Sequence, residues 1–243
     1  MANGVLYQKR KVIKYSKGCF ETAEEPIVKE IQLEIYLNDI YFNSLSCSPG
    51  GYSELAAGFL VSHGLIQRSE EIKEIKCREE RGNVHVQVFL SQENPLSDTK
   101  SSFKPVTAHE IFRAPELLKL ISLLEERSDV FRITGGVHNA ALGNREKLIT
   151  MYEDIGRHNA VDKVLGWTFL NNIPVNDKCL VLSGRVALEI LVKAARSGIP
   201  LVLSRSAPMQ MAVDLAEELG ISIVGFARGD RFYIYTNPQR VVL

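Results

Sequence analysis

The stretch that decides the fold is residues 147–163, KLITMYEDIGRHNAVDK. Its first six residues are typical of a β-strand, and residues 159–170 carry apolar side chains at helical spacing. Between them lies a polar run with two acids, a glycine, an arginine and a histidine. Open α/β sheets place ligand-binding groups at such strand-to-helix turns. The stretch therefore predicts an α/β fold with a polar site at one sheet edge.

Strand-like and helix-like segments alternate around this stretch. The predicted strands are residues 137–142, 147–153, 179–182, 200–203, 221–226 and 232–235. The predicted helices are residues 114–127, 159–170, 186–197 and 208–220. Strand–helix repeats of this kind indicate a mostly parallel sheet with helices on both faces.

The first part of the chain has a different pattern. Residues 31–37 alternate between apolar and polar, as a half-buried strand does, and residues 91–105 are polar with no apolar period. We therefore expect a smaller, strand-rich α+β domain over residues 1–105 that ends in a polar linker. A larger α/β domain should span residues 106–236, with a C-terminal tail at 237–243.

Composition excludes several classes of function. The 243 residues balance 29 basic against 29 acidic side chains, which gives no sign of a nucleic-acid or membrane partner. No apolar stretch approaches the ~20 residues of a spanning helix, and the N-terminus lacks an apolar signal core. We expect a cytoplasmic protein. The four cysteines form no Cys-x-x-Cys pair, so a zinc ribbon is excluded and no protein-held metal is expected.

Polar residues follow four of the predicted strands. If those strands are parallel, the four connections meet at one edge of the sheet. Glycine, serine and arginine at helix N-termini suit phosphate groups, so a nucleotide or phosphorylated cofactor is the expected ligand. The alternative is local pairing of Arg157 with Asp154 and of Arg185 with Glu189. The candidates are Gly156, Arg157, His158, Ser183, Gly184, Arg185, Ser204, Arg205, Ser206, Phe226, Ala227, Arg228, Gly229, Asp230 and Arg231.

A further cluster lies before the first predicted hairpin of the larger domain. Gly135 and Gly136 permit a tight turn, and His138 or His158 could transfer a proton or bind a ligand. The alternative is a structural role for each histidine. A metal site built from His138, Asp154 and His158 has no supporting ligand spacing.

Five segments together resemble the FdhD family of formate dehydrogenase accessory proteins. They are residues 134–138 (TGGVH), 153–163 (EDIGRHNAVDK), 183–185 (SGR), 204–208 (SRSAP) and 225–231 (GFARGDR). The resemblance implies a cytidine-deaminase-like fold for the larger domain and a homodimer. It implies a sulfur carrier that takes sulfur from a cysteine desulfurase and serves formate dehydrogenase. Residues 226–231 would bind the Mo-bis(molybdopterin guanine dinucleotide) cofactor, with GDP-like nucleotides as mimics.

The chain differs from the family at the two positions where the family usually carries a pair of cysteines. Phe103 and Val106 stand where the family usually carries a Cys-x-x-Cys pair. Only a thiolate can take up sulfane sulfur, so sulfur transfer needs another cysteine. Cys47, in an expected loop, is the substitute candidate, whereas Cys179 should be inert in a core strand. The alternative functions are a divergent deaminase-like hydrolase and a cofactor-binding chaperone without chemistry.

Overall fold

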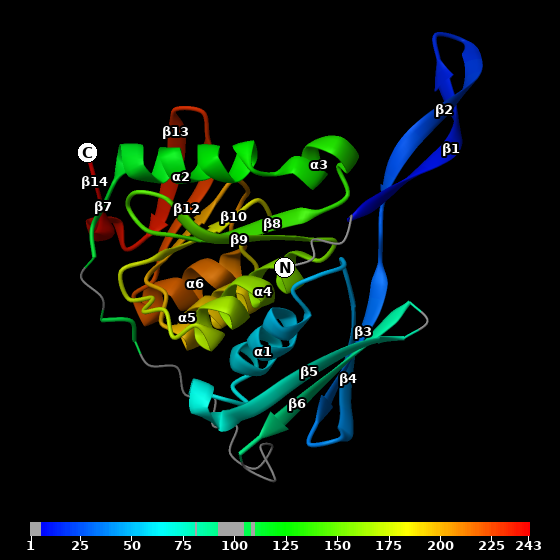
Figure 1. Ribbon diagram of the computed structural model, residues 1–243. Helices are drawn as coiled ribbons and strands as arrows, with labels where there is room; N and C mark the ends of the chain where they lie inside the picture. The colour runs from blue at the N-terminus through cyan, green and yellow to red at the C-terminus, as the bar shows by residue number, and fades with distance from the viewer. Residues whose placement is uncertain (1–5, 81, 92–104, 108–109) are drawn as a thin grey trace.

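The computed structural model describes residues 6–80, 82–91, 105–107 and 110–243 (Figure 1). Its largest sheet has six strands in the order β13-β12-β11-β10-β8-β9. Their bounds are β8 (His138–Gly143), β9 (Leu148–Asp154), β10 (Cys179–Leu182), β11 (Leu201–Ser204), β12 (Ser222–Arg228) and β13 (Arg231–Thr236).

The α/β class is confirmed, but the sheet is mixed rather than mostly parallel. Only the β10–β11 and β11–β12 pairs are parallel, whereas the β8–β10, β8–β9 and β12–β13 pairs are antiparallel. The cause is a short hairpin at each side of the sheet. Because β9 and β10 both run opposite to β8, strands β9, β10, β11 and β12 still point the same way. Their carboxyl ends therefore share one edge, as the sequence predicts for parallel strands.

Helices cover both faces of this sheet (Figure 1). One face carries α4 (Arg157–Leu170), α5 (Leu188–Ser197) and α6 (Gln210–Leu219), and the other carries α2 (Ala114–Glu126). The sequence of β10 is continuously apolar because both faces of this strand are buried. Leu180 and Leu182 enter the core under α4 and α5, while Cys179 and Val181 enter the core under α2. A short helix that the sequence does not predict, α3 (Asp129–Thr134), follows α2.

A second sheet, in the order β4-β3-β6-β5, is built from the first part of the chain. Helix α1 (Tyr52–Ser62) covers its apolar face, where Leu33, Ile35 and Val86 are fully buried. The same helix packs tightly on α4 through glycines of both helices, Gly58 and Gly166. The bounds are β3 (Ile31–Leu37), β4 (Ile40–Cys47), η1 (Ser69–Glu71), β5 (Ile72–Glu80) and β6 (Asn83–Leu90). The expected polar linker falls mostly on residues 92–104, which lie outside the described residues.

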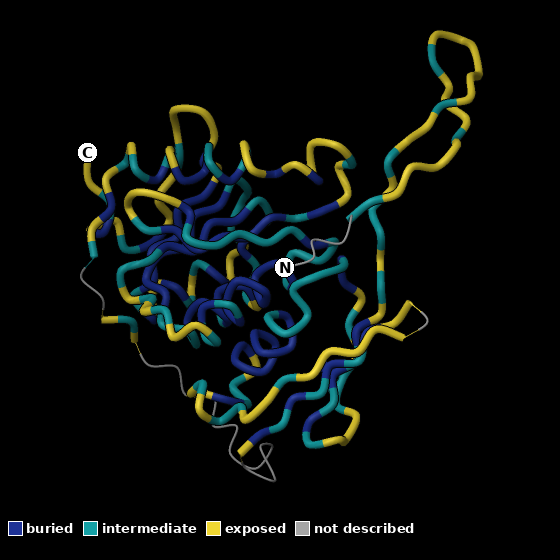
Figure 2. The backbone as a smooth tube through the Cα atoms, in the orientation of Figure 1, coloured by how far each residue is buried: buried dark blue, intermediate teal, exposed yellow. Residues whose placement is uncertain are grey.

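The N-terminal part forms a hairpin that the sequence does not predict. Strands β1 (Tyr7–Ser16) and β2 (Cys19–Val28) pair along their full length and stand away from the body, and Figure 2 shows most of this hairpin as exposed. Lys17 and Gly18 make the turn with positive φ angles of 51° and 83°. We refer to β1 and β2 together as the arm.

The C-terminal residues expected as a tail contribute to the larger unit. After η3 (Pro238–Arg240), β14 (Val241–Val242) pairs with β7 (Phe112–Arg113). Arg240 is buried, and its guanidinium donates to the carbonyl oxygens of Gly220 and Val106. None of the described helices combines the length and the apolar character that crossing a bilayer requires.

Candidate functional site

Asp154 of the polar run and Lys163 of α4 form a buried ion pair. Nζ of Lys163 lies 2.7 Å from Oδ2 of Asp154, and both side chains are almost fully buried. Lys163 also donates to the carbonyl oxygen of Ser48 at 3.1 Å, and the Ser48 backbone N–H donates to Asp154 at 3.1 Å. This part of the run therefore holds the loop after β4 and does not face a ligand.

Gly156 and Asn159 extend the same buried network. The Asn159 amide donates to the carbonyl oxygen of Ser46 at 2.7 Å and to Asp154 at 3.0 Å. The Gly156 N–H also donates to Asp154, at 2.9 Å. Asp154 is thus committed to Lys163 and to backbone donors, and the pairing of Asp154 with Arg157 that the sequence allowed is not what the structure shows.

A group of basic side chains gathers where β8 begins and β9 and β10 end. We call His138, Arg157, Gly184 and Arg185 the arginine cluster. A Cβ atom built on Gly184 would lie 3.4 Å from Nδ1 of His138 and 3.5 Å from Cβ of Arg157. The Nε atom of Arg157 is buried and has no hydrogen-bond partner, and Arg185 is exposed. The structure thus brings together residues from three different connections.

Electrostatics at the arginine cluster favour an anion. Burial, and then the charges of Arg157 and Arg185, lower the pKa of His138. Glu189, which could have neutralised Arg185, lies 3.2 Å from His158 instead. Burial also lowers the pKa of His158, with Arg157 the next cause. The N-terminus of α4 adds partial positive charge, so an anionic group here would relieve an unbalanced positive potential.

The segment 226–231 closes a β-hairpin around Gly229-Asp230, and both of its strands extend further into this segment than the sequence predicts. Strand β12 runs on to Arg228, which is paired in register with Arg231, the first residue of β13. Phe226 has a φ of 50°, unusual for a residue with a side chain, and lies where the register shifts. Its ring remains partly exposed, and Nε of Arg228 donates to the carbonyl oxygen of Arg205 at 3.0 Å. Ala227 is buried under α2, so its side chain cannot contact a ligand.

Ser183 and Ser204 of the predicted site form hydrogen bonds with backbone groups of the strand-end connections. Ser183 Oγ accepts the Asn139 N–H at 2.9 Å. Ser204 Oγ donates to the Gly184 carbonyl oxygen at 2.7 Å and accepts the Ser206 N–H at 3.0 Å. These bonds hold the connections beside the arginine cluster, and the Ser204 hydroxyl is engaged both as donor and as acceptor.

Three further predicted residues, Arg205, Gly135 and Gly136, have structural contacts as well. Arg205 pairs with Glu125 of α2. Gly135 ends α3 with a positive φ of 65°, and a Cβ on Gly136 would lie 2.7 Å from Val28 at the base of the arm. The glycine pair therefore joins α3 to the arm.

The prediction for Cys47 is wrong in its location. Cys47 is the last residue of β4, is fully buried, and burial raises its pKa to about 12. Its thiol is therefore protonated and inaccessible at neutral pH. Cys179 is buried in β10 as expected, and burial raises its pKa too. Cys19 and Cys77 are exposed. Val106 donates its N–H to Leu219 at 2.8 Å, and Phe103 lies outside the described residues.

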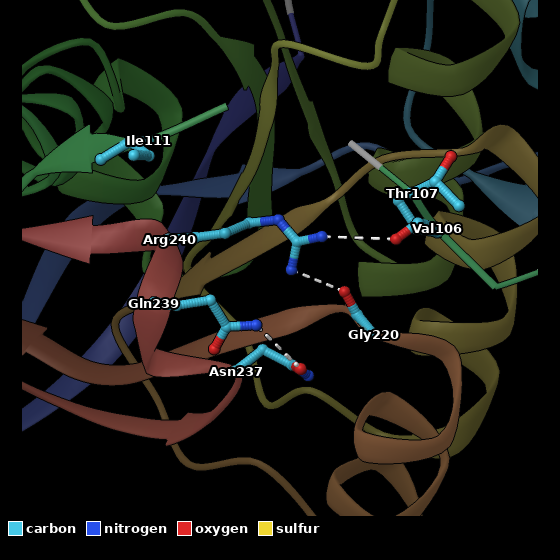
Figure 3. Close-up of a pocket in the computed structure, with 7 residues that line it drawn as sticks. All are labelled: Val106, Thr107, Ile111, Gly220, Asn237, Gln239 and Arg240. Carbon is cyan, nitrogen blue, oxygen red and sulfur yellow. Dashed lines mark hydrogen bonds between the residues drawn. The ribbon is translucent and has the colours of Figure 1, made fainter. Parts of the chain in front are cut away.

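A cavity of about 430 Å³ lies at the opposite edge of the large sheet (Figure 3). It lies beside Gly220, just before β12, and Asn237, just after β13, and Arg240 projects toward it. None of the predicted binding residues lines it. The buried guanidinium of Arg240 is engaged by carbonyl oxygens, so it does not present a free positive charge to this cavity.

The residues of the hydrolase alternative do not act as a unit. Asp154 is paired with Lys163, and His158 is beside Glu189, whereas His138 faces Arg157 and Arg185. Within the described ranges, no three histidine, cysteine, aspartate or glutamate side chains are grouped so that they could hold a metal ion.

Fold and site together define a mixed α/β protein whose strand ends present an arginine-lined edge. Comparison with known proteins gives the family. The model of the FdhD/NarQ family matches residues 28–242. A sulfur carrier protein FdhD from Bacillus pumilus (strain SAFR-032) is 38% identical over 98% of this chain and 99% of its own length. One from Bacillus subtilis (strain 168) is 39% identical over 96% of each chain.

A solved structure agrees with this similarity. The crystal structure of a protein from Desulfotalea psychrophila, assigned as a formate dehydrogenase accessory protein, has a TM-score of 0.87 and 30% identity. The match covers 98% of this chain and 100% of that chain. The chain belongs to the FdhD/NarQ family.

Proposed function

We propose that this protein binds a phosphate-rich guanine-dinucleotide form of the molybdenum cofactor and delivers it to formate dehydrogenase during maturation of that enzyme. The observation that carries the proposal is the arginine cluster, with its buried and unpartnered Arg157 Nε atom. The formate dehydrogenase accessory assignment of the Desulfotalea relative supports the choice of client.

The residues present fit such a ligand. Arginine binds phosphate oxygens through a planar fork of donors, and the cluster supplies two arginines beside a helix N-terminus. Gly184 has no side chain there, so a phosphate can approach the backbone. The partly exposed ring of Phe226, with Arg228 and Arg231 beyond it on the same hairpin, offers a face on which a base can stack. Phosphate groups would contact the arginines, and the base would contact the hairpin.

For sulfur transfer we propose less than the name of the relatives implies. Relatives bear the name sulfur carrier protein, but Cys47 and Cys179 are both buried with raised pKa values. We propose that neither of them carries sulfur and that cofactor binding alone suffices for the accessory role. A cysteine desulfurase would be a partner only through an exposed thiol, for which Cys19 and Cys77 are the described candidates.

Calorimetric titration with GDP tests the binding proposal. The variant with both Arg157→Gln and Arg185→Gln should bind GDP at least about tenfold more weakly, the loss expected for charged hydrogen bonds. Arg145→Gln is the matched control, because Arg145 lies on the β8–β9 turn at the opposite edge and pairs with Glu110. Wild-type protein without GDP affinity, or equal affinity in all three proteins, would overturn the assignment. Restoration of formate dehydrogenase activity in cells lacking their own accessory protein tests the client.

A further inference from the structure

One side chain of the arginine cluster, His138, differs from the two arginines because its charge changes near neutral pH. It is the first residue of β8, and a Cβ atom on Gly184 would lie 3.4 Å from its Nδ1 atom. The side chain is partly buried, and none of the residues that the structure describes forms a hydrogen bond with either ring nitrogen. Its nitrogens are therefore available to a ligand, and a protonated ring donates from both of them.

The charges around His138 are mostly positive. Burial lowers its pKa most, followed by Arg157 at the start of α4 and Arg185 in the β10–α5 connection. Asp154 of β9, which opposes His138 in register, raises the pKa, but this carboxylate is paired with Lys163. These are the charged groups that face the ring from α4, β9 and the β10–α5 connection. His138 is therefore neutral at neutral pH when no ligand is bound.

A bound phosphate group would reverse this balance. The Nε atom of Arg157 is buried and has no hydrogen-bond partner among the described residues, and the N-terminus of α4 adds partial positive charge. Both favour an anion beside Gly184, which is also next to the His138 ring. An opposite charge within about 4–6 Å favours the charged form of a titratable group. An anion at this position therefore raises the pKa of His138.

His158, the other histidine near the cluster, has different surroundings. Its Nε2 atom lies 3.2 Å from Oε2 of Glu189 on α5, so a carboxylate already accompanies this ring. Burial lowers its pKa most, followed by Arg157 and Lys193. Glu189 and Asp162 raise the pKa, and Asp162 is itself paired with Lys193. Because His158 has an internal anion beside it, a bound ligand changes its environment less, and it serves as the matched control.

We propose that His138 takes up a proton from the solvent when the phosphate groups of the ligand bind, and so becomes the third cationic side chain of the arginine cluster. Without ligand, only Arg157 and Arg185 are charged, which limits repulsion within the cluster. Ligand binding is then tighter at lower pH, and release of the ligand returns the proton to the solvent. The inference rests on the proposed function and adds the regulation of that site by pH.

Calorimetric titration with diguanosine pyrophosphate tests the proton uptake. Both phosphates of this dinucleotide are diesters, which do not titrate near neutral pH, so every proton taken up belongs to the protein. Titrations in two buffers of different ionisation enthalpy give the number of protons bound. We expect an uptake of at most about one proton in the wild type. His138→Gln should lose at least about half of this uptake, whereas His158→Gln should retain it.

A pH series gives a second measurement from the affinity alone. One linked proton limits the change in affinity to about tenfold per pH unit. Between about pH 8 and 6, wild-type affinity should rise about threefold or more, and that of His138→Gln by less than about twofold. Thermal unfolding shows whether each variant is folded. NMR titration of the wild-type histidine rings needs no variant, and the His138 ring should titrate at higher pH in the complex than in the free chain.

The outcomes separate this inference from the proposed function. A wild-type protein without affinity for the dinucleotide overturns the proposed function, and this inference with it. Binding without proton uptake, or with uptake that His138→Gln leaves intact, overturns the inference and leaves the proposed function standing. If His158→Gln removes the uptake instead, the proton belongs to His158 and the proposal for His138 is wrong.

Discussion

Asp154 and Lys163 form a fully buried ion pair that joins the large sheet to the loop after β4. Removing one partner of such a pair leaves an uncompensated buried charge. Lys163→Met should therefore lower the free energy of unfolding by about 3–5 kcal/mol. Chemical denaturation monitored by circular dichroism measures this loss. Lys14→Met, at the exposed Lys14–Glu21 pair, should change it by less than about 1 kcal/mol, and equal effects would contradict the assigned role.

The crossing of α1 and α4 predicts a contrast between two glycines. A Cβ on Gly58 would lie 1.8 Å from the carbonyl oxygen of Asp162, so Gly58→Ala must force the helices apart. We expect a loss of about 3 kcal/mol or more in unfolding free energy. Gly184→Ala meets only ordinary contacts, starting at 3.4 Å, so it should fold normally. Its added methyl group should instead reduce GDP affinity, and thermal unfolding with calorimetry separates the two effects.

The β12–β13 hairpin predicts a second contribution to ligand binding. Arg228→Ala or Arg231→Ala should each weaken GDP binding by about 1.5–3 kcal/mol, the size of a hydrogen bond to a charged group. Raising the salt concentration should weaken wild-type binding more than binding by these variants, because fewer charges remain to be screened. Calorimetry at two salt concentrations checks both statements. Unchanged affinity in both variants would place the ligand away from the hairpin.

His138 predicts a dependence of stability on pH. Burial and the neighbouring arginines lower its pKa in the folded chain, whereas an unfolded histidine titrates near about 6.5. The unfolded chain therefore binds the proton more readily, and stability should fall as pH decreases through about 6.5 toward the lowered value. His158 shifts in the same direction, so His138→Asn should flatten the slope only in part. Denaturation midpoints between about pH 8 and 5 test this, and a midpoint that rises on acidification would contradict it.

The burial of Cys47 predicts a negative result in a sulfur-labelling experiment. Incubation with a cysteine desulfurase and labelled cysteine should give Cys47→Ala the same amount of protein-bound label as wild type, because a buried thiol with a pKa of about 12 does not react. Mass spectrometry of peptides locates any label. Loss of label in Cys47→Ala alone, with Cys77→Ala unaffected, would show that the site opens in solution.

The sequence predicts the large sheet well because its signals are local. Strand β10 has the predicted bounds, Cys179–Leu182, since a continuous apolar run flanked by polar turns leaves few alternatives. The strand directions were harder to predict. A short turn forms a hairpin at each side of the sheet, and the sequence pattern does not specify which strands pair there. The arm escaped prediction because its strands bury almost nothing, although Lys17-Gly18 between two extended runs was an available turn signal.

The candidate site was predicted only in part for a different reason. Placing strand ends at one edge predicted that Arg157, Gly184 and Arg185 lie close together, whereas His138 was singled out separately, in the cluster before the first hairpin. It could not show that Asp154 and Lys163 serve the interior, because that depends on Ser46 and Ser48, more than 100 residues earlier in the chain. The burial of Cys47 has the same origin, since Cys47 belongs to a core made of residues from β3, α1 and β6.

The pairing of β14 with β7 has a practical consequence for handling the protein. It fixes the carboxyl terminus at the edge of the large sheet that is farthest from the arginine cluster, beside the cavity in Figure 3. An affinity tag or fluorophore attached after Leu243 would leave the ligand edge and the arm unobstructed. A label on Tyr7, the first residue of β1, would instead sit at the base of the arm.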